Sequence, residues 1–355
     1  MRKLNVLFVF TASFVWATQA AADPVVRQLT GTNAAAIQVA VDLFRTDLGN
    51  PNNGITQGSQ AGGRREITWD GGGAAAPAAP PFTTPMTTFA NRGSVFFTPG
   101  TGFEISGAPT PEFGDLNPTY PGQFAAFSSP RLFTALNSNI TDVVFFVPGD
   151  GTVPAAVTGF GSVFTDVDSE TSTKMEFYAP DGSLIWEGFV PYTPGTETFS
   201  FLGVSFTGEL VARVRIISGN AAPGPDEAGN LDVVAMDDFI FGEPVSTAGL
   251  TITPETGKLF QQGSFDIVVG LQAPTGVTPV SGSVKLDGGD VTGAFAACVE
   301  VGEIVVGGGL TLRCPLPRGV LSPGIDHVLQ VEINLSNQTR VRNAVRWTIV
   351  ASREP

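Results

Sequence analysis

The sequence predicts a mostly β protein: a jelly-roll-like β-sandwich with one N-terminal helix, followed by a smaller immunoglobulin-like β-sandwich. Three observations predict this fold class. Gly (43), Pro (27) and Phe (27) are abundant while charged residues make up only 15% of the chain, a composition that suits short strands joined by Gly/Pro turns. Short apolar runs follow one another through most of the chain. A Pro/Ser/Thr/Gly joint from Pro244 to Gly249, with the linker at 245–249, separates two series of such runs.

The first 22 residues have the three parts of a secretory signal peptide. Arg2 and Lys3 precede an apolar run to Ala17, and small residues lead up to Ala22, after which we expect cleavage. The mature protein is therefore expected to be secreted, at the cell surface or in the periplasm. No later stretch reaches the roughly 18 apolar residues that a spanning helix needs, so the sequence predicts no membrane span in the mature chain.

The acidic balance of the chain excludes two classes of partner. The net charge is −14 at pH 7, and removal of the leader makes it more negative. A polyanion repels nucleic acid and anionic lipid, so we expect neither as a partner.

Residues 23–244 are expected to form the larger domain. One helix is predicted between Asn33, an N-cap residue type, and Gly49, with an apolar face that should lie on a sheet. Its apolar positions are Ile37, Val41, Phe44 and Leu48. Strands are predicted at 64–70, 93–98, 102–106, 124–127, 131–135, 142–147, 157–167, 172–178, 183–190, 196–201, 210–218 and 233–241. The turn sequence at 179–182 predicts a hairpin, and the many antiparallel strands favour a jelly roll.

Residues 250–355 are expected to form the immunoglobulin-like domain. Its strands are predicted at 250–253, 264–271, 281–286, 298–301, 310–314, 328–334 and 341–349. Trp347 is expected in its core. Cys298 and Cys314, the only cysteines, are expected to form a disulfide in an exported chain, which would stabilise it by about 3 kcal/mol.

Asp237 and Asp238 lie side by side in the otherwise apolar stretch 231–243. Because side chains alternate across a strand, one carboxylate should face inward and the other outward. Burying a carboxylate that has no partner costs several kcal/mol. We therefore expect the inner one to have a backbone cap, an arginine or a cation.

A second candidate site is the stretch 64–70. This stretch combines cations, carboxylates and an aromatic face, which are the groups that sugar-binding surfaces use. The residues are Arg64, Arg65, Glu66, Trp69 and Asp70. The alternative is that Trp69 belongs to the core and that the charges protect a sheet edge.

The sequence favours a protein without catalytic activity. His327 is the only histidine, no Gly-x-Ser-x-Gly elbow accompanies it, and we expect it at the surface. No compact pair of acids of the glycosidase kind is evident.

The chain resembles a group of exported bacterial β-sandwich proteins, many of which end in a PEP-CTERM sorting tail. The likeness rests on residues 62–71 (GGRREITWDG), 160–168 (FGSVFTDVD), 201–206 (FLGVSF) and 236–244 (MDDFIFGEP). The sorting tail itself is absent from residues 345–355. The last domain resembles bacterial immunoglobulin-like modules of surface proteins.

The Asp-Asp-Phe of the last strand also resembles that of extracellular carbohydrate-binding jelly rolls, in which an acid at this place holds a structural calcium ion. The resemblance implies that Asp237 or Asp238 is a calcium ligand. Asp166 and Asp168 share a face if the strand continues through them, and they could supply further oxygens. The alternative is that these acids cap turns or lie in water.

These observations favour a secreted or cell-surface, non-enzymatic binding or adhesion protein that recognises glycan or another matrix component. A hydrolase of polysaccharide, using acids around Glu66, Asp70, Asp166 and Asp168, is the first alternative. A structural matrix component is the second.

Overall fold

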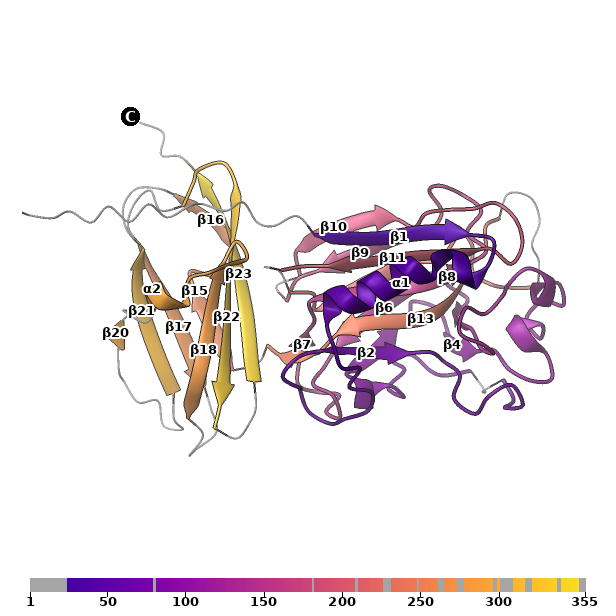
Figure 1. Ribbon diagram of the computed structural model, residues 1–355, viewed down its shortest axis with the longest axis horizontal. Helices are drawn as coiled ribbons and strands as arrows, with labels where there is room; N and C mark the ends of the chain where they lie inside the picture. The colour runs from indigo at the N-terminus through magenta and orange to yellow at the C-terminus, as the bar shows by residue number, and fades with distance from the viewer. Residues whose placement is uncertain are drawn as a thin grey trace, which may run out of the picture.

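The computed structural model describes residues 24–78, 81–180, 182–207, 210–225, 231–247, 249–260, 265–272, 278–295, 299–300, 309–316, 321–336 and 340–350. The expected leader, residues 1–22, lies outside this range. The described chain is mostly β, and its strands form an N-terminal part and a C-terminal part (Figure 1). Within the described ranges, no helix is long and apolar enough to cross a membrane.

Two sheets face each other in the N-terminal part. The seven-stranded sheet contains β1 (Val25–Gly31), β2 (Arg64–Ile67), β4 (Gly102–Ile105), β5 (Phe133–Leu136), β8 (Gly159–Thr165), β11 (Phe199–Ser205) and β13 (Ala235–Gly242). The five-stranded sheet contains β3 (Ser94–Phe97), β6 (Ile140–Phe145), β9 (Lys174–Tyr178), β10 (Leu184–Phe189) and β12 (Arg213–Ile217). Three short 3-10 helices lie in the loops, η1 (Ala90–Arg92), η2 (Pro111–Phe113) and η3 (Tyr120–Gly122).

The strand order confirms the jelly roll. Four strands of one sheet run β11-β8-β13-β5 and four of the other run β10-β9-β12-β6. The first of these eight strands in the chain, β5, pairs with the last, β13. The second pairs with the seventh, the third with the sixth and the fourth with the fifth: β6 with β12, β8 with β11, and β9 with β10. All four pairings are antiparallel, as jelly-roll winding requires. The β9–β10 pairing also confirms the hairpin predicted at residues 179–182.

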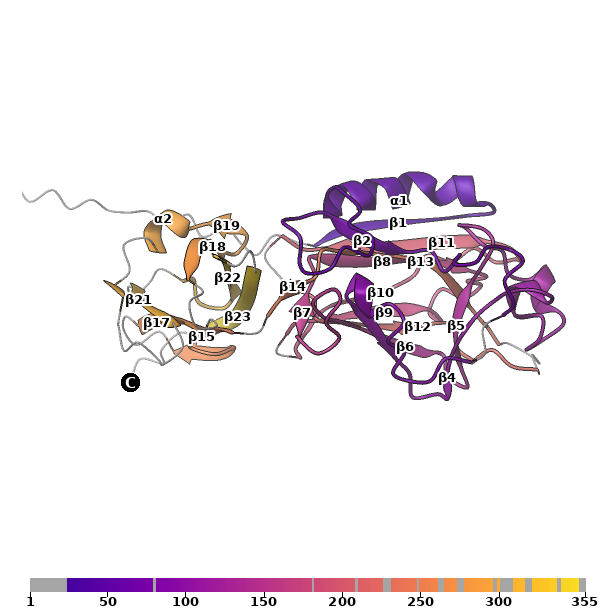
Figure 2. The ribbon, with the colours of Figure 1, turned by 90° about the horizontal axis from the view of Figure 1, so that it is seen from below.

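The helix α1 (Ala34–Leu48) covers the outer side of the seven-stranded sheet (Figure 2). Asn33 caps it as predicted, its Oδ1 accepting a hydrogen bond from the Ala36 amide at 3.0 Å. Phe44 is fully buried and its ring lies on two paired glycines, Gly161 of β8 and Gly203 of β11. A Cβ at either glycine would lie 2.7 Å from the ring. The absence of side chains at this pair lets the helix approach the sheet closely.

The two sheets differ in how their outer faces are covered. Every residue of β8, β11 and β13 is buried, because the core covers one face and α1 with the neighbouring loops covers the other. In β6, β9 and β12 buried and half-buried residues alternate strictly. Alternation of this kind indicates one face on the core and one in water. The outer face of the five-stranded sheet is therefore open.

The C-terminal part has immunoglobulin-like topology. One sheet has the order β15-β17-β21-β20, formed by β15 (Leu250–Thr253), β17 (Phe265–Gln272), β21 (Gly309–Leu316) and β20 (Val299–Glu300). The other has the order β19-β18-β22-β23, formed by β19 (Gly289–Asp290), β18 (Pro279–Leu286), β22 (Asp326–Leu335) and β23 (Arg340–Val350). β16 (Gly257–Phe260) and β14 (Val245–Ser246) pair in parallel with β23, β7 (Ala155–Ala156) pairs with β14, and α2 (Thr292–Phe295) is a single turn. The first sheet matches the A-B-E-D order of immunoglobulin domains and β23-β22-β18 matches G-F-C.

Trp347 is fully buried in this part, as predicted. Its Nε1 donates a hydrogen bond to the Pro254 carbonyl at 3.0 Å. Cys314 is buried on β21, whereas Cys298 lies outside the described residues, so their disulfide stays a prediction.

One strand prediction is wrong, and one strand before the helix was not predicted. Residues 124–127 form a loop, because the amide of Phe127 is bonded to the Asp237 side chain at 2.6 Å and takes no part in a sheet. The sequence also gave no signal for β1, a short strand before the helix that pairs along its whole length with β11.

Candidate functional site

The two adjacent aspartates lie at a β-bulge. Met236 of β13 pairs with Phe164 of β8 and Phe239 pairs with Ser162, so Asp237 and Asp238 together oppose one residue. A bulge of this kind breaks the alternation of side chains. Both carboxylates are buried, with 0% and 1% exposure, and both contact the Ser128 hydroxyl. The prediction that one faces inward and the other outward is therefore wrong.

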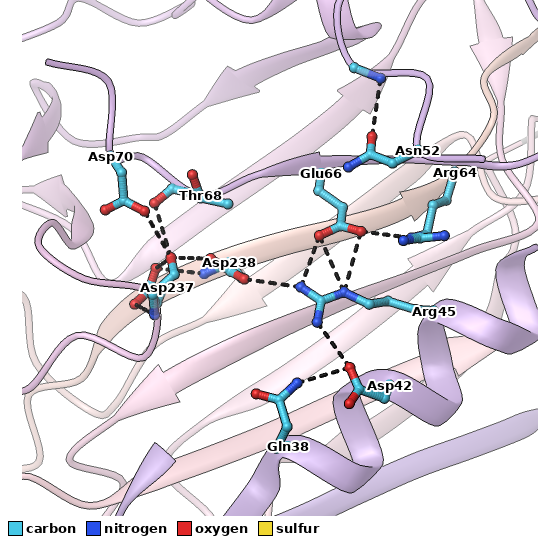
Figure 3. A network of polar contacts seen from close by, with 12 residues as sticks. Gln38, Asp42, Arg45, Asn52, Arg64, Glu66, Thr68, Asp70, Asp237 and Asp238 are labelled. Atoms are coloured by element: carbon cyan, nitrogen blue, oxygen red, sulfur yellow. Dashed lines mark hydrogen bonds and ion pairs between the residues drawn. The ribbon is translucent and has the colours of Figure 1, made fainter. Parts of the chain in front are cut away.

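The partners of the two carboxylates are a backbone cap and an arginine (Figure 3). Oδ2 of Asp237 accepts hydrogen bonds from the amides of Phe127 at 2.6 Å and Ser128 at 3.1 Å. Oδ1 of Asp237 accepts from the Asp238 amide at 2.8 Å. Oδ2 of Asp238 lies 3.4 Å from Nη2 of Arg45 on the helix. The need for a cap or an arginine, inferred from the sequence, is met by one of each.

Three carboxyl groups surround the single hydroxyl of Ser128. Its Oγ lies 2.5 Å from Oδ1 of Asp238, 3.2 Å from Oδ1 of Asp237 and 3.1 Å from Oδ2 of Asp70. A hydroxyl donates one proton, so it cannot donate to all three carboxyl groups at once. Burial, and then the charge of Asp238, raise the pKa of Asp237 well above its ordinary value. Burial also raises the pKa of Asp238.

Arg45 connects the cluster to Glu66 of β2, which also binds Arg64. Glu66 accepts hydrogen bonds from Nη2 of Arg45 at 2.9 Å and from Nε of Arg64 at 2.6 Å. The register of β2 against β13 places Glu66 opposite Ile240, two residues beyond Asp238. One network thus joins candidate residues from two distant stretches of sequence: Arg64, Glu66, Asp70, Asp237 and Asp238. No pattern in the sequence pointed to Ser128, and the sequence placed Arg45 only on the polar face of the helix.

The calcium prediction for Asp237, Asp238, Asp166 and Asp168 stays a prediction. Calcium takes six to eight oxygens, whereas backbone amides already occupy three positions on the carboxylate of Asp237. Asp166 and Asp168 have other neighbours: the Asp166 amide donates to the Thr198 carbonyl, and Oδ1 of Asp168 accepts from the Gly195 amide at 2.7 Å. Among the residues that the structure describes, no group of three or more His, Cys, Asp or Glu could hold a metal ion.

Arg65 and Trp69 point to the opposite side of the sheet, into the core. Arg65 is fully buried and its Nε and Nη2 donate to Glu243 at 2.9 and 2.8 Å. Trp69 is 3% exposed and stacks on Phe133 with ring centroids 4.0 Å apart. A ring packed in this way has no free face for a sugar. The sugar-binding prediction for Arg65 and Trp69 is therefore wrong, and the alternative, a core Trp69, is confirmed.

His327 is buried, in contrast to the expectation of a surface histidine. Its exposure is 0%, Nδ1 lies 2.7 Å from Oδ2 of Asp287, and Nε2 lies 3.1 Å from the Ser322 carbonyl. Asp287 also accepts a hydrogen bond from the Val328 amide at 2.7 Å. The two bonds hold the turn that contains Asp287 against β22. Burial lowers the pKa of His327, but the hydrogen bonds to Asp287 and Ser322 outweigh it and the pKa is raised.

Charged and aromatic side chains lie on the open face of the five-stranded sheet. Cross-strand pairing places Arg215 between Asp142 on β6 and Glu176 on β9, with Glu187 of β10 next to Glu176. Arg215 donates to Asp142 at 2.9 and 2.8 Å, and its side chain is 37% exposed. The neighbouring rows contain Arg213 over the ring of Tyr178 at 3.8 Å, and Lys174 paired with Phe189. From here on, the open face means Asp142, Lys174, Glu176, Tyr178, Glu187, Phe189, Arg213 and Arg215.

Comparisons with known proteins do not identify the chain. No protein-family model matches it, and no curated protein matches it in sequence. Fibronectin(III)-like modules of CbhA from Clostridium thermocellum align with a TM-score of 0.20 and 10% identity, over 62% of this chain and 90% of theirs. Murine CRIg aligns with a TM-score of 0.19 and 13% identity, over 29% of this chain and 97% of that one. A β-1,2-glucanase from Parabacteroides distasonis aligns with a TM-score of 0.19 and 8% identity, over 85% of this chain and 39% of the glucanase. Likeness at these TM-scores carries no functional argument.

Proposed function

We propose that this chain is an extracellular, non-catalytic binding protein that recognises a polysaccharide through the open face of its five-stranded sheet. One observation carries the proposal. The three central strands of this sheet, β6, β9 and β12, alternate between buried and accessible positions, and the accessible ones are mostly charged or aromatic. The other sheet presents its outer face to α1 and to loops.

The chemistry of the open face suits sugar hydroxyls. Guanidinium and carboxylate groups in fixed, paired positions offer donors and acceptors a few ångströms apart, which is how polar groups set the orientation of a ligand. The ion pairs of Arg213 and Arg215 with Asp142, at 2.9 and 2.8 Å, hold these groups in place before any ligand arrives. Pre-organised groups lose less conformational entropy on binding.

Aromatic and apolar side chains lie at one edge of this face. Phe189 and Tyr192 are 48% and 41% exposed, at the end of the edge strand β10 and just after it. Aromatic rings with exposed faces stack on sugar rings. A polysaccharide lying across β10, β9 and β12 would meet rings first and charged groups next.

Affinity electrophoresis in gels that contain one polysaccharide each, neutral or acidic, tests this proposal. We expect at least one polysaccharide to retard the wild-type protein, and the double variant Arg215→Ala/Phe189→Ala to bind it at least tenfold more weakly. Loss of one charged hydrogen bond and one stacking contact accounts for about 2 kcal/mol or more. Leu43→Ala, at a 45% exposed position of the helix on the other sheet, is the matched control and should bind normally.

Two results would overturn the proposal. One is a panel in which no polysaccharide retards the wild-type protein. The other is retardation that the double variant retains in full. Release of reducing ends by the wild-type protein would favour the hydrolase alternative.

A further inference from the structure

A cleft lies where the two parts of the chain meet, beyond the end of β9 and outside the residues of the open face. Its volume is about 560 Å³, and its walls come from Pro180 in the β9–β10 turn, from Thr247 after β14, and from β15 and β23. Pockets that bind small ligands have volumes of this order and occur often at the junction of domains.

Three of the hydrogen-bond donors that line this cleft, on Thr247, Thr251 and Asn343, are bonded to backbone carbonyls. The hydroxyl of Thr247 donates to the Pro154 carbonyl at 3.3 Å, and that of Thr251 donates to the Gly270 carbonyl at 3.2 Å. The amide of Asn343 donates to the Leu250 carbonyl at 2.6 Å. A hydroxyl that donates its one proton inward has only lone pairs left for a ligand. The cleft is therefore rich in acceptors, and it suits a ligand that brings donors.

Its charge is negative. Glu255 is exposed in the lining, and no ion pair of this residue occurs within the described ranges. Arg346, which follows Val345 of the lining, is 3.5 Å from Asp326 and is paired with it. The negative charge of the chain as a whole, −14, adds a field that attracts cations.

The remaining lining is apolar. Half-buried Pro180 and Ala344 supply carbon surface beside the oxygens of the threonines and of Glu255, with Ile252 and Val345 of the core behind them. Methylene groups gain from contact with such a surface.

We infer that this cleft binds an aliphatic amine: a compound with protonated amino groups on a methylene chain. One ammonium group lies against the Glu255 carboxylate and the oxygen of Thr251, and the methylene chain lies on Pro180 and Ala344. This site is separate from the polysaccharide surface, and either could fail without the other.

Isothermal titration of the full chain with 1,4-diaminobutane tests the inference. We expect saturable binding, about fivefold weaker in Glu255→Gln, which is the size of one accessible charge contact, and weaker in Thr251→Val, which keeps the shape but removes the oxygen. Glu170→Gln, at an exposed position of another loop, is the matched control and should bind as the wild type does. 1,4-Butanediol, with the same chain and no charge, should not bind.

The inference is overturned if the diamine gives no saturable heat, or if butanediol binds equally well. It is also overturned if Glu170→Gln weakens binding as much as Glu255→Gln does, since the diamine would then be held by the overall charge alone.

Discussion

Glu104 on β4 should make the stability of the protein fall as the pH rises to neutrality. It is a buried carboxyl group, with 3% exposure, and burial, then the charge and hydrogen bond of Asp115, raise its pKa from 4.5 to about 7. Below pH 4.5 the group is neutral in both the folded and the unfolded chain. Between about pH 4.5 and pH 7 the unfolded chain ionises while the folded protein keeps its proton, so unfolding becomes easier as the pH rises.

The size of this effect follows from the shift. Each pKa unit corresponds to about 1.4 kcal/mol, so the raised pKa of Glu104 lowers the free energy of unfolding by about 3 kcal/mol between acid and pH 8. Glu104→Gln keeps the shape of the side chain and cannot ionise. We expect the variant to match the wild type near pH 4 and to be about 3 kcal/mol more stable at pH 8.

Urea unfolding at several pH values between 4 and 8, followed by tryptophan fluorescence, measures this difference. The comparison of variant with wild type isolates Glu104 from the other buried acids, which Gln at position 104 leaves in place. Curves of unfolding free energy against pH that run parallel for the two proteins would refute the reasoning. So would a variant that loses stability at pH 8.

Three further predictions concern buried groups. Asp237→Ala leaves three backbone amides without their acceptor, and it should lower the free energy of unfolding by about 4 kcal/mol; a loss below 1 kcal/mol in urea titrations would contradict the network. Gly203→Ala places a Cβ 2.7 Å from the ring of Phe44 and should cost about 2 kcal/mol, whereas Gly62→Ala, with nothing within 4 Å of the new atom, should change little in the same titrations. The pKa of His327 is raised, so the stability that its charge contributes is present below pH 6.5 and is lost as the pH rises through the higher pKa of the folded protein. An NMR titration of its imidazole protons that shows a pKa below 6.5 would disprove this.

Local signals in the sequence predicted the elements that depend on neighbouring residues. The helix begins after Asn33 and ends at Gly49 because a capping side chain and a glycine of positive φ act within one turn. Trp347 was placed in the core because of its size and its position in an apolar strand. The jelly roll followed from the number of strands and the one helix, since few antiparallel arrangements bury so many apolar faces.

The sequence also predicts on which side of the strand each side chain of residues 64–70 lies, but it does not predict the residues that these side chains contact. Alternation puts Arg65 and Trp69 on one side and Glu66 on the other, as observed. An arginine can lie in the core only because Glu243, 178 residues away in sequence, meets it. His327 is buried for the same reason, since Asp287 reaches it from 40 residues away.

The aspartate pair shows the limit of a rule that depends on regular pairing. Alternation assigns Asp237 and Asp238 to opposite faces, but the rule holds only while the strand stays in register with its neighbour. The bulge opposite β8 shifts that register by one residue. It depends on the pairing of two strands distant in sequence, so the stretch 231–243 alone does not reveal it.

The most direct test of polysaccharide recognition is NMR mapping on the ¹⁵N-labelled protein. Titration with a polysaccharide that retards it in gels should shift the amide signals of β9, β10 and β12 and leave those of α1 unchanged. Shifts centred on α1 or on the C-terminal part, with the five-stranded sheet unaffected, would contradict the assignment of the binding surface.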